Sequence, residues 1–326
     1  MTGELISLFV AFSWTATALF AEVGSRRMGS LSFNAVRMTM STVLLALTLW
    51  LVMGAPYPRF ANGAAWGWLL LSGLVGYVIG DYCLMQGYIH IGARFGQLFM
   101  TLSAPAAAIT ARLLIGERMH PTAVLGMAVT LGGIAMSVLA REDGEGRSRG
   151  VRLKLPAKGV FYAAMAGVGQ GVGLVLSKTG LLQYEESVMA ASLSLQYAPQ
   201  GVLVPLPLKY SIPFAATLIR SYIGIAGFYI SLALFGRQGL RQLGSAVRDR
   251  KAMWCALWST LFGPFIGVSA SLLATLYTNA GVAQTIFALT PVLIIAPSAL
   301  LFHQKVTVRE VVGAVISVVG VSLFFL

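Results

Sequence analysis

Charged residues are scarce in this sequence. Only 10% of its 326 residues are Asp, Glu, Lys or Arg, whereas a soluble globular domain carries roughly 25%. The shortage excludes an ordinary water-soluble domain, whose surface is covered largely by charged and polar side chains. Apolar residues make up 57% of the sequence and fall in long runs. Both observations predict an integral membrane protein.

Cysteine and histidine are scarcer still, with two and three residues in the whole sequence. Cys83 and Cys255 lie inside apolar runs, so we expect no disulfide and infer no redox compartment from them. The histidines are far apart and have no metal-ligand spacing and no recognisable serine partner. We therefore expect no metal, no cofactor and no enzymatic activity.

Basic residues outnumber acidic ones and give a formal net charge of +12. They gather between the apolar runs, which is typical of loops at a membrane surface, so we expect a lipid bilayer and no nucleic acid as partner. The first apolar run lacks a basic leader and an Ala-x-Ala-like cleavage site. It is therefore predicted to be a membrane helix that is retained and not a signal peptide.

The apolar runs are long enough to be membrane helices, which need about 20 residues each. They are continuous and lack the alternation of barrel strands, which excludes a transmembrane β-barrel. We predict five helices, a basic linker at 141–158, and five more helices. The predicted ranges are 4–23, 31–53, 64–90, 93–115 and 121–140, then 159–179, 212–236, 252–278, 281–302 and 307–325.

The two halves of the sequence repeat each other at an offset of 187 residues. Glycine is common in membrane helices, so one match would mean little. A single ungapped offset that holds over more than fifty residues is stronger evidence. It predicts a duplicated five-helix unit, with repeats at 1–140 and 159–326. The matched pairs are Gly76 with Gly263, Gly80 with Gly267, Gln97 with Gln284, Leu102 with Leu289, Val124 with Val311, Gly126 with Gly313, and Gly133 with Gly320.

An odd number of helices per unit means that the second unit enters the membrane from the opposite side. Inverted repeats are typical of secondary transporters, whose sites lie near the midplane between the repeats. Pro105 and Pro291 interrupt the fourth helix of each half, and each removes one backbone hydrogen bond. We interpret both prolines as helix hinges; the alternative is that they are kinks needed only for packing.

Three stretches resemble a known family. They are "GARFGQLFMTLSAPAAAITARLLIGERMHPTAVLGMAVTLGGIAMSVL", its echo "AGVAQTIFALTPVLIIAPSALLFHQKVTVREVVGAVISVVGVSLFFL", and "GQGVGLVLSK". The sequence is similar to the EamA-like ten-helix members of the drug/metabolite transporter superfamily over nearly its whole length. Gly116-Glu117 matches the family's turn between helices four and five. The second half has His303-Gln304 there, so we give the turn carboxylate no obligatory chemical role.

The resemblance implies a secondary-active transporter in the plasma membrane, the inner membrane of a bacterium. It implies alternating access of a central cavity between helices one, three and four and helices six, eight and nine. The expected substrates are small polar metabolites or amino acids, which the protein would export with possible coupling to protons. A non-transporting membrane scaffold or sensor built on the same fold is the alternative.

Asp81 interrupts the apolar run "GLVGYVIGDYCLMQGYIHIG". An acidic residue at the centre of a span costs about 2.5–3.5 kcal/mol on insertion scales, which marks it as a candidate functional residue. Its counterpart in the second half is Val268, so the repeat architecture does not require it. Asp81 could pair locally with Tyr82, Gln86 or an arginine of a neighbouring helix. It could instead line the transport path or carry the coupled proton.

Arg37 and Arg220 lie near the start of the second helix of each half. Each could extend to the lipid headgroups, or it could line the cavity, attract an anionic group or pair with Asp81. Glu22 and Lys178 lie near the ends of the first helices, where residence at the membrane interface is expected more than substrate contact.

Three glutamines are further candidates for the transport path. Gln97 and Gln284 occupy equivalent places at the start of helices four and nine, and Gln170 lies in the glycine-rich stretch of helix six. Such side chains form hydrogen bonds between helices or line a site.

The orientation in the membrane is left open by the sequence. Most Lys and Arg residues fall on the side of loops 141–158 and 237–251, which the positive-inside rule places in the cytoplasm with both termini outside. The family resemblance implies cytoplasmic termini instead. Residues 183–211 are apolar but rich in proline, and we interpret them as an interfacial or re-entrant insertion and not an eleventh span.

Overall fold

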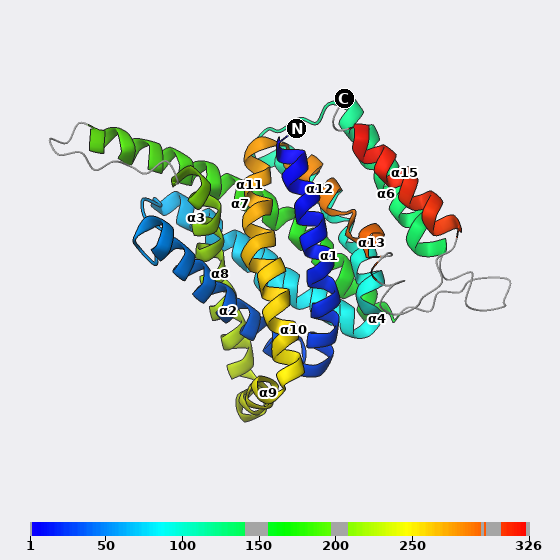
Figure 1. Cartoon of the computed structure of the whole chain (residues 1–326), viewed down its shortest axis with the longest axis horizontal. Helices are drawn as coiled ribbons and strands as arrows, with labels where there is room; N and C mark the ends of the chain where they lie inside the picture. The colour runs from blue at the N-terminus through cyan, green and yellow to red at the C-terminus, as the bar shows by residue number, and fades with distance from the viewer. Residues whose placement is uncertain (1, 141–155, 197–207, 295–296, 298–307, 324–326) are drawn as a thin grey trace.

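The structure is a computed structural model that describes residues 2–140, 156–196, 208–294, 297 and 308–323. All regular structure in these ranges is helical (Figure 1). The first half contains six α-helices and one π-helical segment, and the second half begins with α7 after the linker. They are α1 (Thr2–Met28), α2 (Ser30–Met53), α3 (Gly63–Gly73), η1 (Leu74–Asp81), α4 (Tyr82–Met100), α5 (Ser103–Leu114), α6 (Pro121–Ala140) and, after the linker, α7 (Ala157–Gln196).

The second half continues with helices that match those of the first half in order. A second π-helical segment again interrupts the third long helix of the half. The elements are α8 (Leu208–Leu234), α9 (Gly236–Arg248), α10 (Arg250–Thr260), η3 (Leu261–Phe265), α11 (Ile266–Tyr277), α12 (Ala280–Phe287), α13 (Thr290–Leu293) and α15 (Val308–Ser322).

The described helices account for all ten predicted spans. Seven are long and apolar enough to cross a membrane, and three shorter apolar helices fall where the fifth, ninth and tenth spans are predicted. The third span is built from α3, η1 and the first part of α4, and Gly92, with φ 79°, separates it from the fourth. The eighth span joins α10, η3 and α11 end to end. The prediction of a ten-helix all-α membrane protein is confirmed.

The repeat at an offset of 187 residues is visible in local backbone features. The π-helical segments begin at Leu74 and Leu261, which are 187 residues apart. The fourth and ninth spans break after Met100 and Phe287, again at that offset. Contacts between helices show the repeat as well, because the first helix of each repeat packs on the third helix of the other. Helix α1 packs on α10 and α11 of the second repeat, while α7 packs on α3 and η1 of the first.

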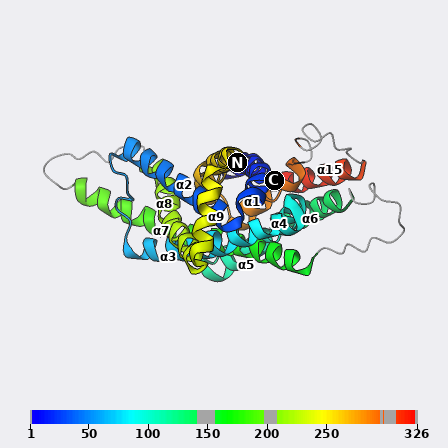
Figure 2. The same ribbon diagram turned by 90° about the horizontal axis from the view of Figure 1, so that it is seen from below.

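The fifth and tenth spans, α6 and α15, cross each other through equivalent residues at one edge of the bundle (Figure 2). The Thr130 hydroxyl donates to the Ser317 carbonyl at 3.5 Å, and the Ser317 hydroxyl donates to the Thr130 carbonyl at 3.4 Å. A Cβ on Gly133 would lie 2.6 Å from the Ser317 nitrogen, and one on Gly320 would lie 2.5 Å from the Thr130 nitrogen. The glycines therefore let the two backbones meet.

Residues 183–196 differ from the sequence-based prediction. They form no separate interfacial or re-entrant element, because α7 continues through them as one helix of 40 residues. Alanine, leucine and glutamate in this stretch favour helix, and the proline signal begins only at Pro199. The rest of the predicted insertion up to 207 lies outside the described residues.

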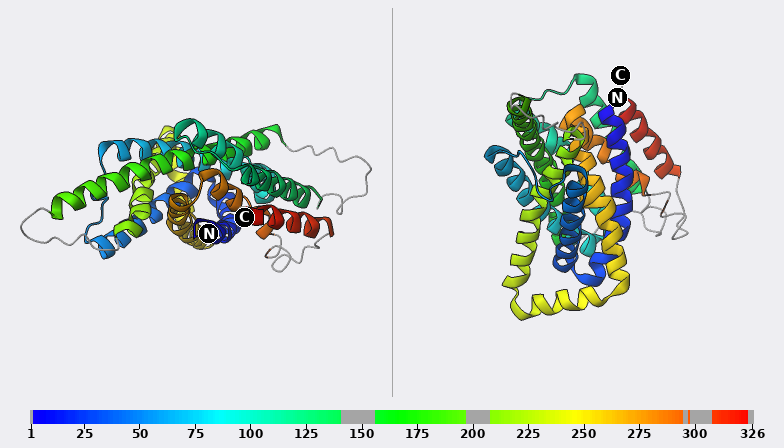
Figure 3. Two further views of the ribbon diagram at one scale, coloured as in Figure 1. Left: turned by 90° about the horizontal axis from the view of Figure 1, so that it is seen from above. Right: turned by 60° about the vertical axis from the view of Figure 1, so that its left-hand side comes forward.

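Helix α9 lies across the ends of the spans and connects α8 to α10 (Figure 3). With ten spans, this connection is on the same face as the end of α6. Helix α1 begins and α15 ends at the opposite face. The two π-helical segments contribute Tyr77, Asp81, Gly263 and Pro264 to the wall of a cavity.

Candidate functional site

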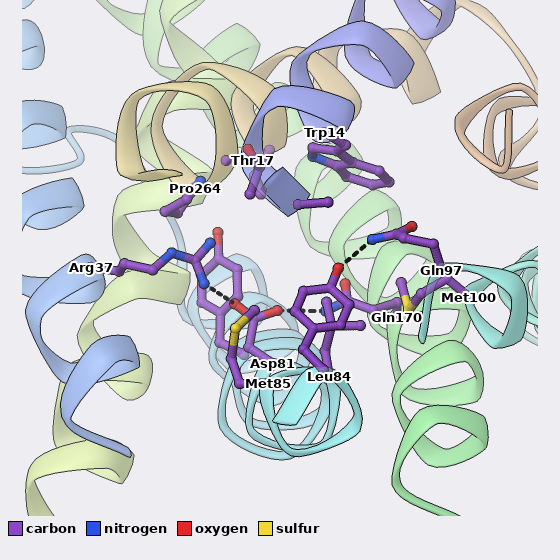
Figure 4. Close-up of a pocket in the computed structure, with 15 residues that line it drawn as sticks. Trp14, Thr17, Arg37, Asp81, Leu84, Met85, Gln97, Met100, Gln170 and Pro264 are labelled. Atoms are coloured by element: carbon purple, nitrogen blue, oxygen red, sulfur yellow. Dashed lines mark hydrogen bonds and ion pairs between the residues drawn. The ribbon is translucent and has the colours of Figure 1, made fainter. Parts of the chain in front are cut away.

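A cavity of about 60 Å³ lies between the two repeats at the centre of the bundle (Figure 4). Both repeats contribute to its wall, as expected for the binding site of an inverted-repeat protein. Its polar groups converge from α2, η1, α4 and α7. The lining residues are Trp14, Thr17, Ala18, Arg37, Tyr77, Asp81, Leu84, Met85, Tyr88, Gln97, Met100, Gln170, Gly263, Pro264 and Val268.

Asp81 and Arg37 form a buried ion pair in the cavity wall. Arg37 Nη1 lies 3.7 Å from Asp81 Oδ2, and their side chains are 4% and 10% exposed. Arg37 therefore does not extend to the headgroups, and Asp81 does not pair with Tyr82 or Gln86. The structure combines two of the alternatives for Asp81 that the sequence left open. Asp81 pairs with an arginine of a neighbouring helix, and it also lies on the cavity wall.

Gln170 and Asn34 hold this pair in place. Gln170 Nε2 donates to Asp81 Oδ1 at 2.8 Å and to the Gly76 carbonyl at 3.0 Å. Asn34 Nδ2 donates to the Asp81 backbone carbonyl at 3.2 Å, and Arg37 Nη1 donates to Asn34 Oδ1 at 3.0 Å. A buried charge needs such hydrogen bonds in addition to its counter-ion.

Gln97 lies across the cavity from the ion pair, where Figure 4 shows its amide directed at a ring hydroxyl. The amide nitrogen of Gln97 donates to the Tyr88 hydroxyl. Its repeat counterpart, Gln284, is 1% exposed but does not line the cavity. Gln284 Oε1 has no hydrogen-bond partner among the described residues. The two glutamines are equivalent in the fold and different in their surroundings.

Arg220 is also placed away from the cavity. Its guanidinium lies 4.5 Å from the centroid of the Tyr77 ring, and Tyr77 separates it from the cavity. The repeat is nevertheless visible here. A Cβ on Gly76 would lie 3.0 Å from Arg220 Nη2, and one on Gly263 would lie 3.0 Å from Arg37 Nη2. Each arginine rests on a glycine of the π-helical segment in the other repeat.

The second repeat has no carboxylate at the position equivalent to Asp81. The counterpart of Asp81 is Val268, and both residues line the same cavity. One half of the wall therefore carries an acid and the other an apolar side chain. This asymmetry was visible in the sequence.

Backbone breaks lie close to both predicted hinge prolines. The turn at Thr101 and Leu102 precedes Pro105, and the turn at Ala288 and Leu289 precedes Pro291. Proline cannot donate to the carbonyl four residues earlier. The carbonyl freed by Pro291 accepts a hydrogen bond from the Thr290 hydroxyl at 2.9 Å instead. The breaks are part of the structure, and their role as hinges stays a prediction.

A second ion pair lies near the face where α1 begins. Lys178 of α7 forms a hydrogen-bonded ion pair with Glu117, and its ammonium also donates to the Thr278 carbonyl at 3.0 Å. Glu117 Oε2 in turn accepts from the Ala280 nitrogen at the start of α12, at 3.1 Å. Lys178 does not line the cavity. The turn carboxylate thus joins the two repeats on this face.

Sequence analysis missed several lining residues, among them Trp14, Thr17, Tyr77 and Tyr88. Aromatic and hydroxyl side chains are frequent throughout the chain, and nothing in their spacing separates these four from the others. The only available signal was the pair Gly76 and Gly263, which marks the π-helical segments next to the cavity. Within the described residues, no group of three or more His, Cys, Asp or Glu side chains could hold a metal ion.

Comparison with known proteins gives one family. The model of the EamA-like transporter family matches residues 1–139 and 186–326. A solved crystal structure of a protein matches 99% of this chain and 96% of its own, with a TM-score of 0.59 and 15% sequence identity. At that identity the likeness concerns the fold alone. No curated protein matches.

Proposed function

Because the chain belongs to the EamA-like transporter family and is a multi-pass membrane transporter, we propose that it exports small polar metabolites or amino acids by alternating access of its central cavity. The predicted repeats, 1–140 and 159–326, would be the two bodies that move. The inner membrane of a bacterium is the proposed location. The family also points to a protein without enzymatic activity.

The buried pair of Arg37 and Asp81 is the observation that carries the proposal. It places a cationic and an anionic group 3.7 Å apart on the wall of one cavity. A substrate with a carboxylate and an ammonium group could bind between them and exchange one internal ion pair for two with the substrate. Such an exchange limits the desolvation cost of both protein charges.

Alternating access is supported by how the repeats are joined. On the face where α1 begins, the Glu117–Lys178 pair connects the loop before α6 to α7 and to the start of α12. In this proposal, the pair holds this face closed. Opening it would require the pair to separate while the fourth and ninth spans bend at their breaks near Pro105 and Pro291. A helix that already lacks a backbone hydrogen bond loses little more by bending there.

Asp81 has two candidate roles in such a cycle. It could bind the amine of the substrate, or it could carry the proton that drives export. Protonation of Asp81 would release Arg37 from the ion pair. Gln170 would then be the remaining side-chain hydrogen-bond partner of Asp81. The charge of Asp81 would thus be coupled to two other groups of the wall, Arg37 and Gln170.

Transport into vesicles tests both the proposal and the role. Purified protein in vesicles is given a panel of radiolabelled amino acids and polar metabolites, with and without a proton gradient. Asp81→Asn keeps the size of the side chain and removes its charge. If Asp81 couples protons, the variant loses gradient-driven accumulation and keeps substrate exchange; if it binds an amine, both fall together.

The control for this experiment is Asn62→Asp, a charge change at the N-cap of α3 and away from the cavity. The variant is compared with the wild type from about pH 5.5 to about pH 8, a range over which a buried carboxyl group can titrate. Equal transport by the two proteins over this range would contradict a role for the acid. If no solute of the panel moves under any gradient, the alternative of a non-transporting scaffold or sensor gains support.

A further inference from the structure

A groove of about 440 Å³ lies outside the bundle, between α2 and the corner formed by α9 and α10. It is separate from the central cavity and shares no lining residue with it. Its volume is within the range of small-ligand sites, about 300–1,000 Å³. The lining residues are Met40, Val247, Arg250, Met253, Trp254 and Leu257.

The groove has one charged end and an otherwise apolar lining. Arg250, at the start of α10, is exposed, while Met40, Met253 and Leu257 are half-buried along the apolar part. Trp254 lies one helical turn further into the span than Arg250 and is 60% exposed. Tryptophan at this depth is typical of the interface between headgroups and hydrocarbon. The groove therefore suits an amphiphile with its polar end at the membrane surface.

The charge around the groove is positive. Helix α9 carries Arg237, Arg241 and Arg248 across the ends of the spans, and Arg250 and Lys251 follow it (Figure 3). The one acid of this corner is Asp249. Its carboxylate already accepts a hydrogen bond from Arg27 at 2.7 Å and caps α10 through the Ala252 nitrogen at 3.1 Å. The corner thus attracts an anionic group.

We propose that the groove is a binding site for an anionic phospholipid of the surrounding bilayer. The phosphate would lie against Arg250 and Lys251, and one acyl chain would follow Met253, Trp254 and Leu257 toward Met40. Basic residues near a bilayer surface attract anionic lipids with about 1 kcal/mol each. Charge complementarity selects this occupant over a zwitterionic lipid or a second copy of the chain.

The site has a structural link to the central cavity. Met40 lies one turn beyond Arg37 on α2, and α10 leads directly into η3, whose Gly263 contacts Arg37. A lipid in the groove would brace α2 against α10 behind the cavity wall. The proposal stands on the groove itself and needs no assumption about the substrate.

Tryptophan quenching by brominated lipids tests the site. The full chain is reconstituted in phosphatidylcholine bilayers, and phosphatidylglycerol with a dibrominated acyl chain is added in increasing mole fraction. Brominated phosphatidylcholine serves as the reference lipid. We expect the anionic lipid to quench at lower mole fractions than the zwitterionic one. Trp254→Phe should remove this difference, which assigns the signal to the groove.

Arg250→Gln is the test variant and Arg241→Gln its matched control, since both remove one exposed positive charge from the same corner. Loss of about 1 kcal/mol corresponds to about a fivefold higher lipid fraction at half-quenching for Arg250→Gln, with little change for Arg241→Gln. Equal quenching by both lipids in the wild type overturns the proposal. An equal effect of the Arg250 and Arg241 substitutions also overturns it. The proposal fails as well if neither lipid quenches Trp254 because the groove is covered by a second copy of the chain.

Discussion

At the scale of single residues, the central feature is a charge pair removed from both water and lipid. Arg37 and Asp81 form an ion pair, and each also has an amide as hydrogen-bond partner, Asn34 for the arginine and Gln170 for the acid. Arg37 Nε has no hydrogen-bond partner among the described residues. Removing charges from water costs several kcal/mol per ion, and only good geometry with further hydrogen bonds offsets it. Each member of the pair is therefore stable only while its partner is present.

We expect Arg37→Met to lower the free energy of unfolding by about 3–5 kcal/mol, because it leaves Asp81 buried without a counter-ion. The double variant Arg37→Met with Asp81→Asn should recover much of this loss. Thermal or denaturant unfolding in detergent micelles measures both. A double variant that is no more stable than Arg37→Met alone would contradict a mutual dependence.

Arg220→Met serves as the comparison. Arg220 faces the Tyr77 ring at 4.5 Å, and the direct ion-pair partner of Asp81 is Arg37 and not Arg220. A cation–π contact contributes about 0.5–2 kcal/mol, so the loss should be smaller than for Arg37→Met.

At the scale of elements, the helices are interrupted where the cavity needs them to be. Both π-helical segments lie in the third helix of their repeat, and each brings a glycine against an arginine of the other repeat. Pro264 lies inside the second segment, where it removes one backbone donor. The first segment contains no proline and is also π-helical, so proline alone does not account for the two segments.

The sequence predicts these elements unevenly. Apolar runs and repeated glycines predict where the ten spans lie, because a bilayer imposes both length and composition. The predicted end of the sixth span at 179 is wrong, since α7 continues to Gln196, and the end of the ninth span lies outside the described residues. They do not predict the π-helical segments, since one extra residue in a turn leaves the apolar pattern almost unchanged. Asp81 and Arg37 are visible as charges in apolar runs, but their pairing depends on how two helices cross. The neutral residues Tyr88 and Trp14 carry no signal at all.

The crossing of α6 and α15 gives a prediction for an element contact. In Gly320→Ala the new Cβ would lie 2.5 Å from the Thr130 nitrogen, which is backbone and cannot yield without moving α6. Overpacking of this kind costs about 1–3 kcal/mol. We expect the free energy of unfolding in detergent to fall by that amount.

Gly132→Ala is the matched control, because a Cβ on Gly132 meets nothing within 4 Å. It should be neutral or stabilise α6 by about 0.5–1 kcal/mol, the usual gain over glycine in a helix. Similar losses in both variants would mean that helix propensity and not the crossing decides the result.

At the scale of the whole molecule, ion pairs of different burial join the two repeats on both faces. Near the start of α1, Glu117, Lys178 and Ala280 connect elements of both repeats, and the Lys178 and Glu117 side chains are 10% and 16% exposed. Near α9, Arg27 of α1 pairs with Asp249 at 2.7 Å through side chains that are 46% and 28% exposed. Exposed ion pairs contribute little, so we expect the more buried pair near the start of α1 to be the stronger connection.

We expect Lys178→Met to open the face where α1 begins, because Glu117 then loses its ionic partner. Accessibility is measured at Thr17→Cys, a cavity position, in a background with Cys83 and Cys255 replaced by alanine. A membrane-impermeant maleimide added from that face should label the variant several-fold faster. Lys158→Met, an exposed lysine near the start of the same helix, should leave the rate unchanged. Equal rates in all three proteins would show that the pair does not hold the face closed.

The crossing of α6 with α15 has a consequence for the ancestry of the protein. Thr130 and Ser317 exchange equivalent hydrogen bonds, and Gly133 and Gly320 make equivalent close approaches. A contact in which both sides use the same patch is what two identical chains make around a two-fold axis. An ancestor of half the present length could therefore have assembled as a pair of antiparallel copies. Gene fusion would then have freed each half to diverge, so that Asp81 arose or survived on one side only, opposite Val268.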